Sequence, residues 1–251
     1  DLILECSGDP VVANTLVELT DTAAFKVVFS SQTPEVKGRA DTLVWVYGVN
    51  DAEYQPALHR FAINPGCLNN CLIPLLATLT DKLEVYSGTF VSVHSVTNTQ
   101  PPLDRIAKNP RWSRAAFENL VPAGHDPSQL IARFFPTLGD RLIGRTVRAP
   151  VAHTSYVTVT LDLGVGLTVE RLHHVLATSP IRPSVFGIDD RPLVSSDYKF
   201  ESRSSVVDGT SIRVLDGRMA FFSAWYNNEW AFAQRMIDLA TACAVKVSET
   251  P

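Results

Sequence analysis

Short apolar runs alternate with a helix pattern at the start of the chain, and this alternation constrains the fold more than any other feature. Residues 1–6 and 25–30 have the composition of buried strands, and residues 43–47 form a third such run. Turn residues at 7–10 separate the first run from residues 11–19, whose apolar positions repeat at helical spacing. Strands that alternate with helices are typical of parallel sheets. The first part of the chain is therefore predicted to form a parallel α/β sheet.

The chain opens directly on a strand, without a preceding turn, cap or methionine. A parallel sheet rarely begins in the middle of a strand–helix unit, so we expect an N-terminal piece to precede Asp1. No Gly-x-Gly-x-x-Gly turn, which holds the phosphates in dinucleotide-binding sheets, occurs in the sequence. This chain alone is therefore expected to bind a dinucleotide poorly.

Longer runs rich in β-branched residues follow residue 60. Residues 155–163 alternate between apolar and polar positions, as expected for a strand of an antiparallel sheet with one buried face. A helix is predicted at 68–79, with its apolar face at Leu72, Leu75, Leu76 and Leu79. The other predicted elements are strands at 89–96, 145–149, 204–207, 210–215 and 219–225, and helices at 169–178 and 230–245.

The predicted fold class is α/β: a partial Rossmann-type parallel sheet, followed by an α+β domain with a mostly antiparallel sheet. The predicted boundaries are 1–66 for the remainder of the first domain and 67–229 for the second. Residues 230–251 are expected to form a C-terminal helix that returns to the first domain. Residues 98–118 form a polar, proline-bearing connection that is long enough to be functional.

Composition excludes several classes of protein. Hydrophobic residues make up 45% of the 251 residues and charged residues 19%, which supplies a core and argues against disorder. The net charge of −4 argues against a general binder of nucleic acid or of a membrane surface, and no apolar run reaches the roughly 18 residues of a membrane span. The four cysteines are too few for a disulfide scaffold and lack zinc spacing, so a reducing, cytoplasmic setting and no metal site are predicted.

Cys67 is the residue whose setting best suits covalent chemistry. It follows Pro65 and Gly66 at the start of a predicted helix, where backbone N–H groups and the helix dipole stabilise a thiolate. A cysteine is more often a small buried hydrophobic side chain, and a lone histidine in a strand is usually structural. His94, late in a β-branched strand, is nevertheless suited to accept the thiol proton of Cys67.

The segments around these two residues resemble the catalytic segments of the glyceraldehyde-3-phosphate dehydrogenase family, which includes erythrose-4-phosphate dehydrogenase. The resemblance extends over the whole chain, and its motifs occur in the family's order. The matching stretches are residues 4–8, 47–50, 64–71, 93–100, 192–197, 203–208 and 225–230. Four stretches favour the erythrose-4-phosphate branch, namely residues 26–30, 133–136, 207–210 and 228–230.

The resemblance implies oxidation of a phosphorylated aldehyde with NAD or NADP as cofactor, through a thioester on Cys67. It makes His94 the base and the backbone N–H of Cys67 an oxyanion donor. Substrate phosphate is expected to bind Arg148, Thr97 and Thr99, and the nicotinamide side of the cofactor to lie at Ser7, Gly8, Ser30 and Asn228. Phe232 stands where the family usually has tyrosine. The family also implies a homotetramer, for which residues 155–163 and their neighbours would supply an apolar sheet face.

One site departs from the family pattern. Gly66 and Leu68 replace the hydroxyl residues that bind the attacking inorganic phosphate, and His125 and Asp126 replace its second element. Leucine donates no hydrogen bond to phosphate, and a carboxylate repels one. Two hypotheses therefore stay open: a dehydrogenase that is biased towards hydrolysis or an unusual acceptor, and a non-catalytic or regulatory paralogue.

Overall fold

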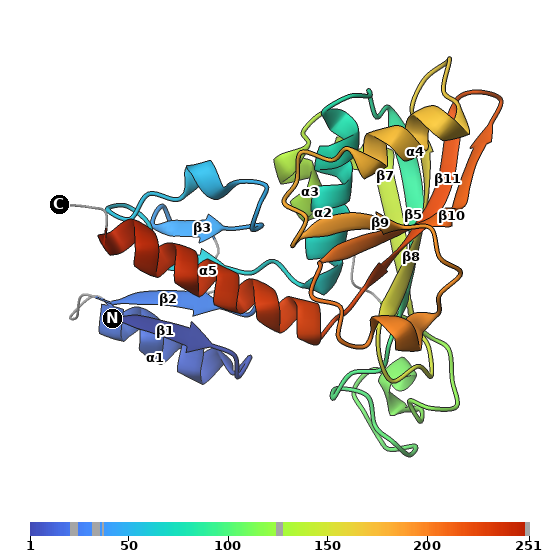
Figure 1. The fold of residues 1–251 in the computed structure, drawn as a ribbon. Helices are drawn as coiled ribbons and strands as arrows, with labels where there is room; N and C mark the ends of the chain where they lie inside the picture. Colours follow the sequence, from blue (N-terminus) through green and yellow to red (C-terminus); the bar gives the residue numbers. More distant parts are fainter. Residues whose placement is uncertain (21–24, 32–35, 37, 124–127, 249–251) are drawn as a thin grey trace. The chain divides into compact units, whose positions relative to one another are not determined.

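The computed structural model describes residues 1–20, 25–31, 36, 38–123 and 128–248, which divide into two compact units (Figure 1). Asp1–Gly66 and Phe232–Pro251 make up the first unit, and Cys67–Ala231 make up the second. No helix in these described ranges is both long and apolar enough to cross a membrane.

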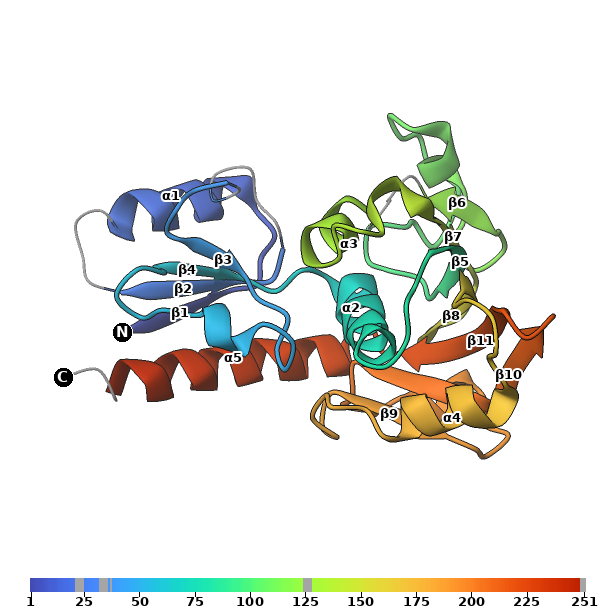
Figure 2. The ribbon, with the colours of Figure 1, turned by 90° about the horizontal axis from the view of Figure 1, so that it is seen from above.

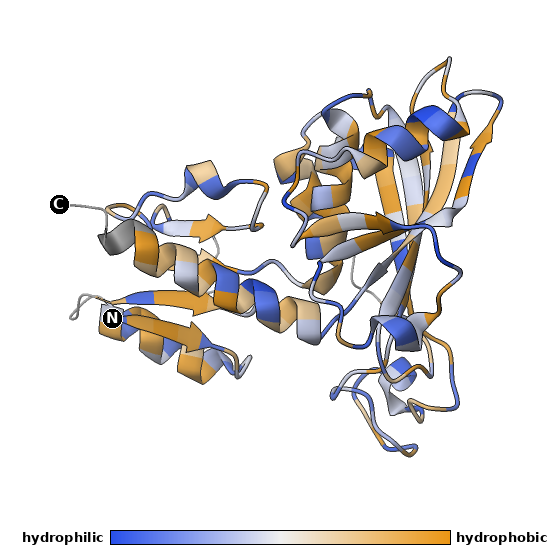
Figure 3. Cartoon of the chain, in the orientation of Figure 1, coloured by the Kyte–Doolittle hydropathy of each residue, from blue (hydrophilic) through white to orange (hydrophobic). Residues whose placement is uncertain are grey.

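The first unit contains a four-stranded sheet in the order β1-β2-β4-β3, with every pair of neighbours parallel. Figure 2 shows the first helix and the last on opposite sides of this sheet, and Figure 3 shows β1 and β2 as mostly hydrophobic, as is typical of strands buried on both faces. Met236, Leu239 and Cys243 of the last helix pack with Val28 and Trp45. The elements are β1 (Leu2–Glu5), α1 (Pro10–Thr20), β2 (Lys26–Phe29), β3 (Thr42–Val44), a 3-10 turn (Asp51–Glu53), β4 (Phe61–Ile63) and α5 (Trp230–Ser248).

The second unit contains a seven-stranded sheet in the order β6-β7-β5-β8-β11-β10-β9. Four of its neighbouring pairs are antiparallel, and two, β5 with β7 and β9 with β10, are parallel. Helices α2, α3 and α4 pack against the strands on one face (Figure 1). The strands are β5 (Ser87–His94), β6 (Val121–Ala123), β7 (Leu142–Arg148), β8 (Ser155–Asp162), β9 (Phe186–Asp189), β10 (Ser205–Leu215) and β11 (Met219–Tyr226). The helices are α2 (Cys67–Thr80), α3 (Ser128–Phe134) and α4 (Val169–Ala177), and 3-10 turns span Pro110–Ser113, Gly139–Arg141 and Ser195–Tyr198.

These two sheets confirm the predicted fold class: a parallel sheet, and then a mostly antiparallel one. The prediction of separate strands at 204–207 and 210–215 is wrong, because one strand, β10, continues through a register shift between Asp208 and Arg213. The predicted apolar face of the helix at 68–79 is buried, at Leu72, Leu75, Leu76 and Leu79, and burial extends beyond it. Nearly every residue of α2, the polar Asn69 and Asn70 included, is buried, because the helix lies between the sheet and the helices α3 and α4.

Candidate functional site

The thiol of Cys67 lies at the first residue of α2. Gly66 before it has a φ of 101°, and a Cβ placed there would meet no atom within 4 Å. The positive φ, rather than crowding, is therefore what favours glycine at this turn. The turn directs Cys67 towards the end of β5, where its Sγ lies 3.4 Å from Nε2 of His94. The structure thus brings together the two residues that the sequence paired.

His94 ends strand β5 and is buried. Its Nδ1 lies 2.8 Å from the carbonyl oxygen of Ser95. A carbonyl oxygen only accepts, so the tautomer that satisfies Ser95 carries its proton on Nδ1 and leaves Nε2 as an acceptor for Cys67. The ring of Tyr226 meets the His94 ring edge-on, with centroids 5.8 Å apart.

Arg148 ends strand β7 directly opposite His94 in the parallel register of β5 and β7. Its Nη1 lies 2.7 Å from Nδ1 and 3.4 Å from Nε2 of His94, and 3.3 Å from the carbonyl oxygen of Ser95. Its Nε is buried and has no acceptor among the described residues. Buried donors in proteins are nearly always satisfied, so this N–H is available to a group that does not belong to the chain, such as a ligand or an ordered water.

Burial sets the ionisation of this site. It raises the pKa of the Cys67 thiol, while the charge of Arg148 and the backbone N–H groups of Leu68 and Cys67 act in the opposite direction. The backbone N–H groups at the helix start thus favour a thiolate, as the sequence predicts, and burial acts against them. Burial also keeps the pKa of Tyr226 well above its usual value, so its hydroxyl stays protonated.

Thr97 and Thr99 lie just beyond β5. Their hydroxyl oxygens are 3.0 Å apart, and Thr97 is half-buried while Thr99 is exposed. The bonds from Ala149 N to His94 O and from Val96 N to Val151 O keep this segment beside the chain that follows Arg148. No contact among the described residues joins either threonine to Arg148. Thr97 and the buried Gln100 line a hollow of about 470 Å³, and Gln100 Nε2 has no acceptor in the described part of the chain.

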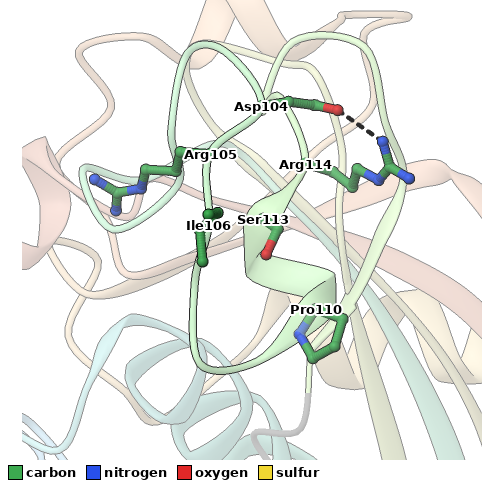
Figure 4. Close-up of a pocket in the computed structure, with 6 residues that line it drawn as sticks. All are labelled: Asp104, Arg105, Ile106, Pro110, Ser113 and Arg114. Carbon is green, nitrogen blue, oxygen red and sulfur yellow. Dashed lines mark hydrogen bonds and ion pairs between the residues drawn. The ribbon is translucent and has the colours of Figure 1, made fainter.

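A second hollow of about 470 Å³ lies within residues 104–114, and Figure 4 shows it. Arg114 Nη1 and Asp104 Oδ2 form an ion pair of 2.7 Å at its rim, and both side chains are exposed. None of the predicted site residues lines this hollow.

The structure brings together Ser7, Gly8 and Ser30 in the first unit. Ser7 N, Ser7 Oγ and Gly8 N all approach Oε1 of Glu5, at 2.7, 2.5 and 3.3 Å, and Ser30 N donates to the Glu5 carbonyl oxygen at 2.9 Å. Glu5 is almost fully buried. Asn228 belongs to the second unit, where its Oδ1 accepts from Ser95 Oγ at 2.6 Å.

Two residues of these clusters were not predicted from the sequence. Glu5 holds the Ser7–Gly8 turn, and Ser95 orients both His94 and Asn228. Ser95 could have been found from its position directly after His94, and Glu5 could have been found as an acidic residue that ends a buried strand.

Of the altered acceptor residues, Leu68 is buried, and His125 and Asp126 lie outside the described residues.

Comparison with known proteins identifies the relatives of this chain. Residues 66–228 match the family described as glyceraldehyde 3-phosphate dehydrogenase, C-terminal domain. Glyceraldehyde-3-phosphate dehydrogenase 3 of a Nostoc species is 34% identical over 250 residues, which cover 98% of this chain and 73% of that protein. Glyceraldehyde-3-phosphate dehydrogenase of Zymomonas mobilis is 35% identical over 250 residues, covering 97% of this chain and 72% of the relative. The chain therefore belongs to the glyceraldehyde-3-phosphate dehydrogenase family.

Proposed function

We propose that the protein oxidises a phosphorylated aldehyde, of the glyceraldehyde-3-phosphate or erythrose-4-phosphate type, with NAD or NADP and through a thioester on Cys67. The observation that supports this most is the 3.4 Å separation of Cys67 Sγ from Nε2 of His94. The relatives that match the chain are named as glyceraldehyde-3-phosphate dehydrogenases. Residues 1–66 would be the remainder of a dinucleotide-binding domain, and residues 67–229 the catalytic domain.

The first step is a proton transfer. Nε2 of His94 takes the proton of the Cys67 thiol, and the sulfur then attacks the aldehyde carbon to form a thiohemiacetal. The backbone N–H groups at the start of α2 would stabilise the oxygen that becomes negative. The His94 imidazolium would return its proton to this oxygen, which gives the thiohemiacetal hydroxyl, and neutral His94 would accept that proton again as hydride leaves the carbon, which gives the thioester. A bound nicotinamide supplies the hydride acceptor for that oxidation.

Arg148 is the proposed ligand of the substrate phosphate. A guanidinium presents several donors in one plane, and Nε of Arg148 is a buried donor without an acceptor. Thr97 and Thr99 supply hydroxyl groups just beyond the paired strand. A phosphate held here would lie near the two residues that carry the chemistry.

The cofactor residues fit their proposed roles. Gly8 has a φ of 66° and open space where a Cβ would stand, so a ligand can approach the backbone there. Because Asn228 Oδ1 accepts from Ser95, its amide nitrogen is directed away from Ser95 as a donor for a carboxamide. Glu5 fixes the turn that holds Ser7 and Gly8.

A non-catalytic paralogue is the second candidate, and Leu68 is the observation that favours it. Its buried isobutyl group stands where the family pattern has a hydroxyl for the attacking phosphate. Such a protein would keep the fold for assembly or regulation, and it would not form a thioester.

The test uses the protein as its own gene encodes it, including any residues that precede Asp1. We expect the parent protein to form NADH or NADPH with glyceraldehyde 3-phosphate or erythrose 4-phosphate. In Cys67→Ser the rate should fall by about 10⁴-fold or more, because a serine hydroxyl beside His94 stays protonated. Cys71→Ser, on the same helix, is the matched control and should stay active. Turnover in Cys67→Ser near that of the parent would remove Cys67 from the mechanism, and no turnover in either protein would favour the paralogue.

A further inference from the structure

Ser95 lies directly after His94 and is almost fully buried within the second unit. Both of its main-chain groups are held. Its N–H donates to Ser155 Oγ at 3.1 Å, and its carbonyl oxygen lies 2.8 Å from Nδ1 of His94 and 3.3 Å from Nη1 of Arg148. These contacts leave the backbone of Ser95 little freedom, so the position of its side-chain hydroxyl is restricted as well.

The hydroxyl oxygen of Ser95 lies 2.6 Å from Oδ1 of Asn228. This separation suits an O–H···O bond and is shorter than the roughly 2.7–3.2 Å that is usual for N–H···O bonds. The distance therefore favours the amide oxygen of Asn228, and not the amide nitrogen, as the atom that faces Ser95. Asn228 is only half-buried, which fits a side chain that accepts from Ser95 at one end and meets a ligand at the other.

The main chain beside Asn228 is fixed by Asn227. The side-chain Oδ1 of Asn227 accepts from the N–H groups of Glu229 and Trp230, at 2.9 and 2.7 Å. These bonds hold the turn between β11 and α5, but they do not involve the side chain of Asn228. The rotation of the Asn228 amide about its last bond therefore depends on the hydroxyl of Ser95.

We propose that Ser95 is a positioning residue for the cofactor: its hydroxyl holds the Asn228 amide with the N–H donor towards the ligand, so the site selects a pyridine ring that carries a carbonyl group. This inference rests on the proposed function. An asparagine amide offers an acceptor at one end and a donor at the other, and the two ends exchange when the amide turns over. Without the hydroxyl of Ser95, the amide is free to turn and accepts from a ligand as readily as it donates.

The test measures binding by calorimetry and needs no turnover. It uses the protein as its own gene encodes it and three forms of the dinucleotide, NAD or NADP, that the protein binds more tightly. These are the natural cofactor, its 3-acetylpyridine analogue, which keeps the carbonyl and lacks the amino group, and its 3-aminopyridine analogue, whose substituent only donates. The parent protein should bind the aminopyridine analogue about tenfold more weakly than the other two, because a donor that faces a donor loses a hydrogen bond. In Ser95→Ala this preference should fall to about twofold, because the amide can turn to accept.

Ser92→Ala is the matched control, because Ser92 is a buried serine of the preceding strand β5 whose hydroxyl lies 2.7 Å from that of Tyr226. It should keep the preference of the parent protein. Asn228→Ala should lose the preference, and adding Ser95→Ala to it should change nothing further, because Ser95 acts through that amide.

An unchanged preference in Ser95→Ala would overturn the role of Ser95, as would an equal fall in Ser92→Ala or a parent-like preference in Asn228→Ala. The last variant keeps the test decisive even where Ser95→Ala does not fold. A parent protein that binds the dinucleotide without this preference refutes the role of Ser95 and leaves the proposed function standing. A parent protein that binds none of the three ligands refutes both.

Discussion

Leu68 and Gly66 flank the proposed nucleophile, and neither side chain offers a donor to an attacking phosphate. Each hydrogen bond to a charged group that is missing costs about 1.5–3 kcal/mol of phosphate binding. We therefore predict that turnover depends little on inorganic phosphate and that the product is the free acid. The measurement is NADH or NADPH formation against phosphate concentration, with sulfate at equal ionic strength as control and the product identified by mass spectrometry.

A gain-of-function variant sharpens this prediction. Leu68→Thr returns one hydroxyl to the first turn of α2, and Leu72→Thr places the same change one turn later on the same helix. Activation by phosphate should appear in the first variant and not in the second. Saturable activation of the parent protein, with an acyl phosphate as its product, would contradict the prediction.

At the scale of single residues, the sequence predicted that Cys67 and His94 are neighbours, but it did not predict the electrostatic surroundings of the pair. The turn before Cys67 and the β-branched run that ends in His94 were local signals, and the two side chains do meet. The contact of Arg148 with His94 joins residues 54 positions apart through the parallel pairing of β5 and β7, which no local pattern reveals. Burial by the whole fold raises the pKa of Cys67 against the backbone N–H groups that the sequence indicated, and no local pattern reveals that burial.

Strands β5 and β7 form the element that places His94 opposite Arg148, and a close contact fixes their spacing. Gly144 on β7 is paired with Phe90 on β5, and a Cβ at Gly144 would stand 1.8 Å from Cζ of the buried Phe90 ring. Gly144→Ala should therefore force the ring to move and lower the free energy of unfolding by about 1–3 kcal/mol. Urea unfolding measures the loss as a lower midpoint with an unchanged slope.

The double variant Gly144→Ala/Phe90→Leu tests the cause. Leucine lacks the ring atoms that the new methyl group would meet, so the two changes should be less destabilising together than the sum of the single effects. Additive losses would show that the close contact is not what makes Gly144 necessary.

Element prediction succeeded where a pattern was long. The eight-residue strand β8 and the nine-residue helix α4 carry clear periodicity, and both were predicted with nearly correct ends. The three-residue strands β4 and β6 are too short to show a period, and they exist because neighbouring strands pair with them. The helix α3 was not predicted either, because its seven residues make about two turns and are too few to show a helical period.

At the scale of the whole molecule, the open face of the seven-stranded sheet remains to be explained. Helices cover one face. On the other face, one row of neighbouring residues runs across β7, β5, β8 and β11: Ile143, Thr89, Thr160 and Phe221. In the next row on this face, Val91 of β5 is paired with Thr158 of β8. Val91, Ile143 and Phe221 are 48%, 60% and 46% exposed, and they stand among threonines and beside the exposed Arg145, a mixture of apolar and polar side chains that many interfaces share. We propose a second copy of the protein as the partner of this face.

We predict that Val91→Glu lowers the molecular mass of the protein in solution. Val91 lies on the central strand β5, so a second copy on this face would bury the new carboxylate without a partner, at a cost of about 2–5 kcal/mol per interface. Light scattering after size-exclusion chromatography measures the mass. Val165→Glu is the matched control, because Val165 is 84% exposed and lies outside every strand; this variant should have the mass of the parent protein.

The Val91→Glu subunits should stay folded, because the altered face is opposite the one that α2 covers. They should keep the circular dichroism spectrum of the parent protein, and Cys67 should still react with an alkylating reagent. A parent protein that is already monomeric, or a Val91→Glu protein of unchanged mass, would show that this face is not where the copies meet.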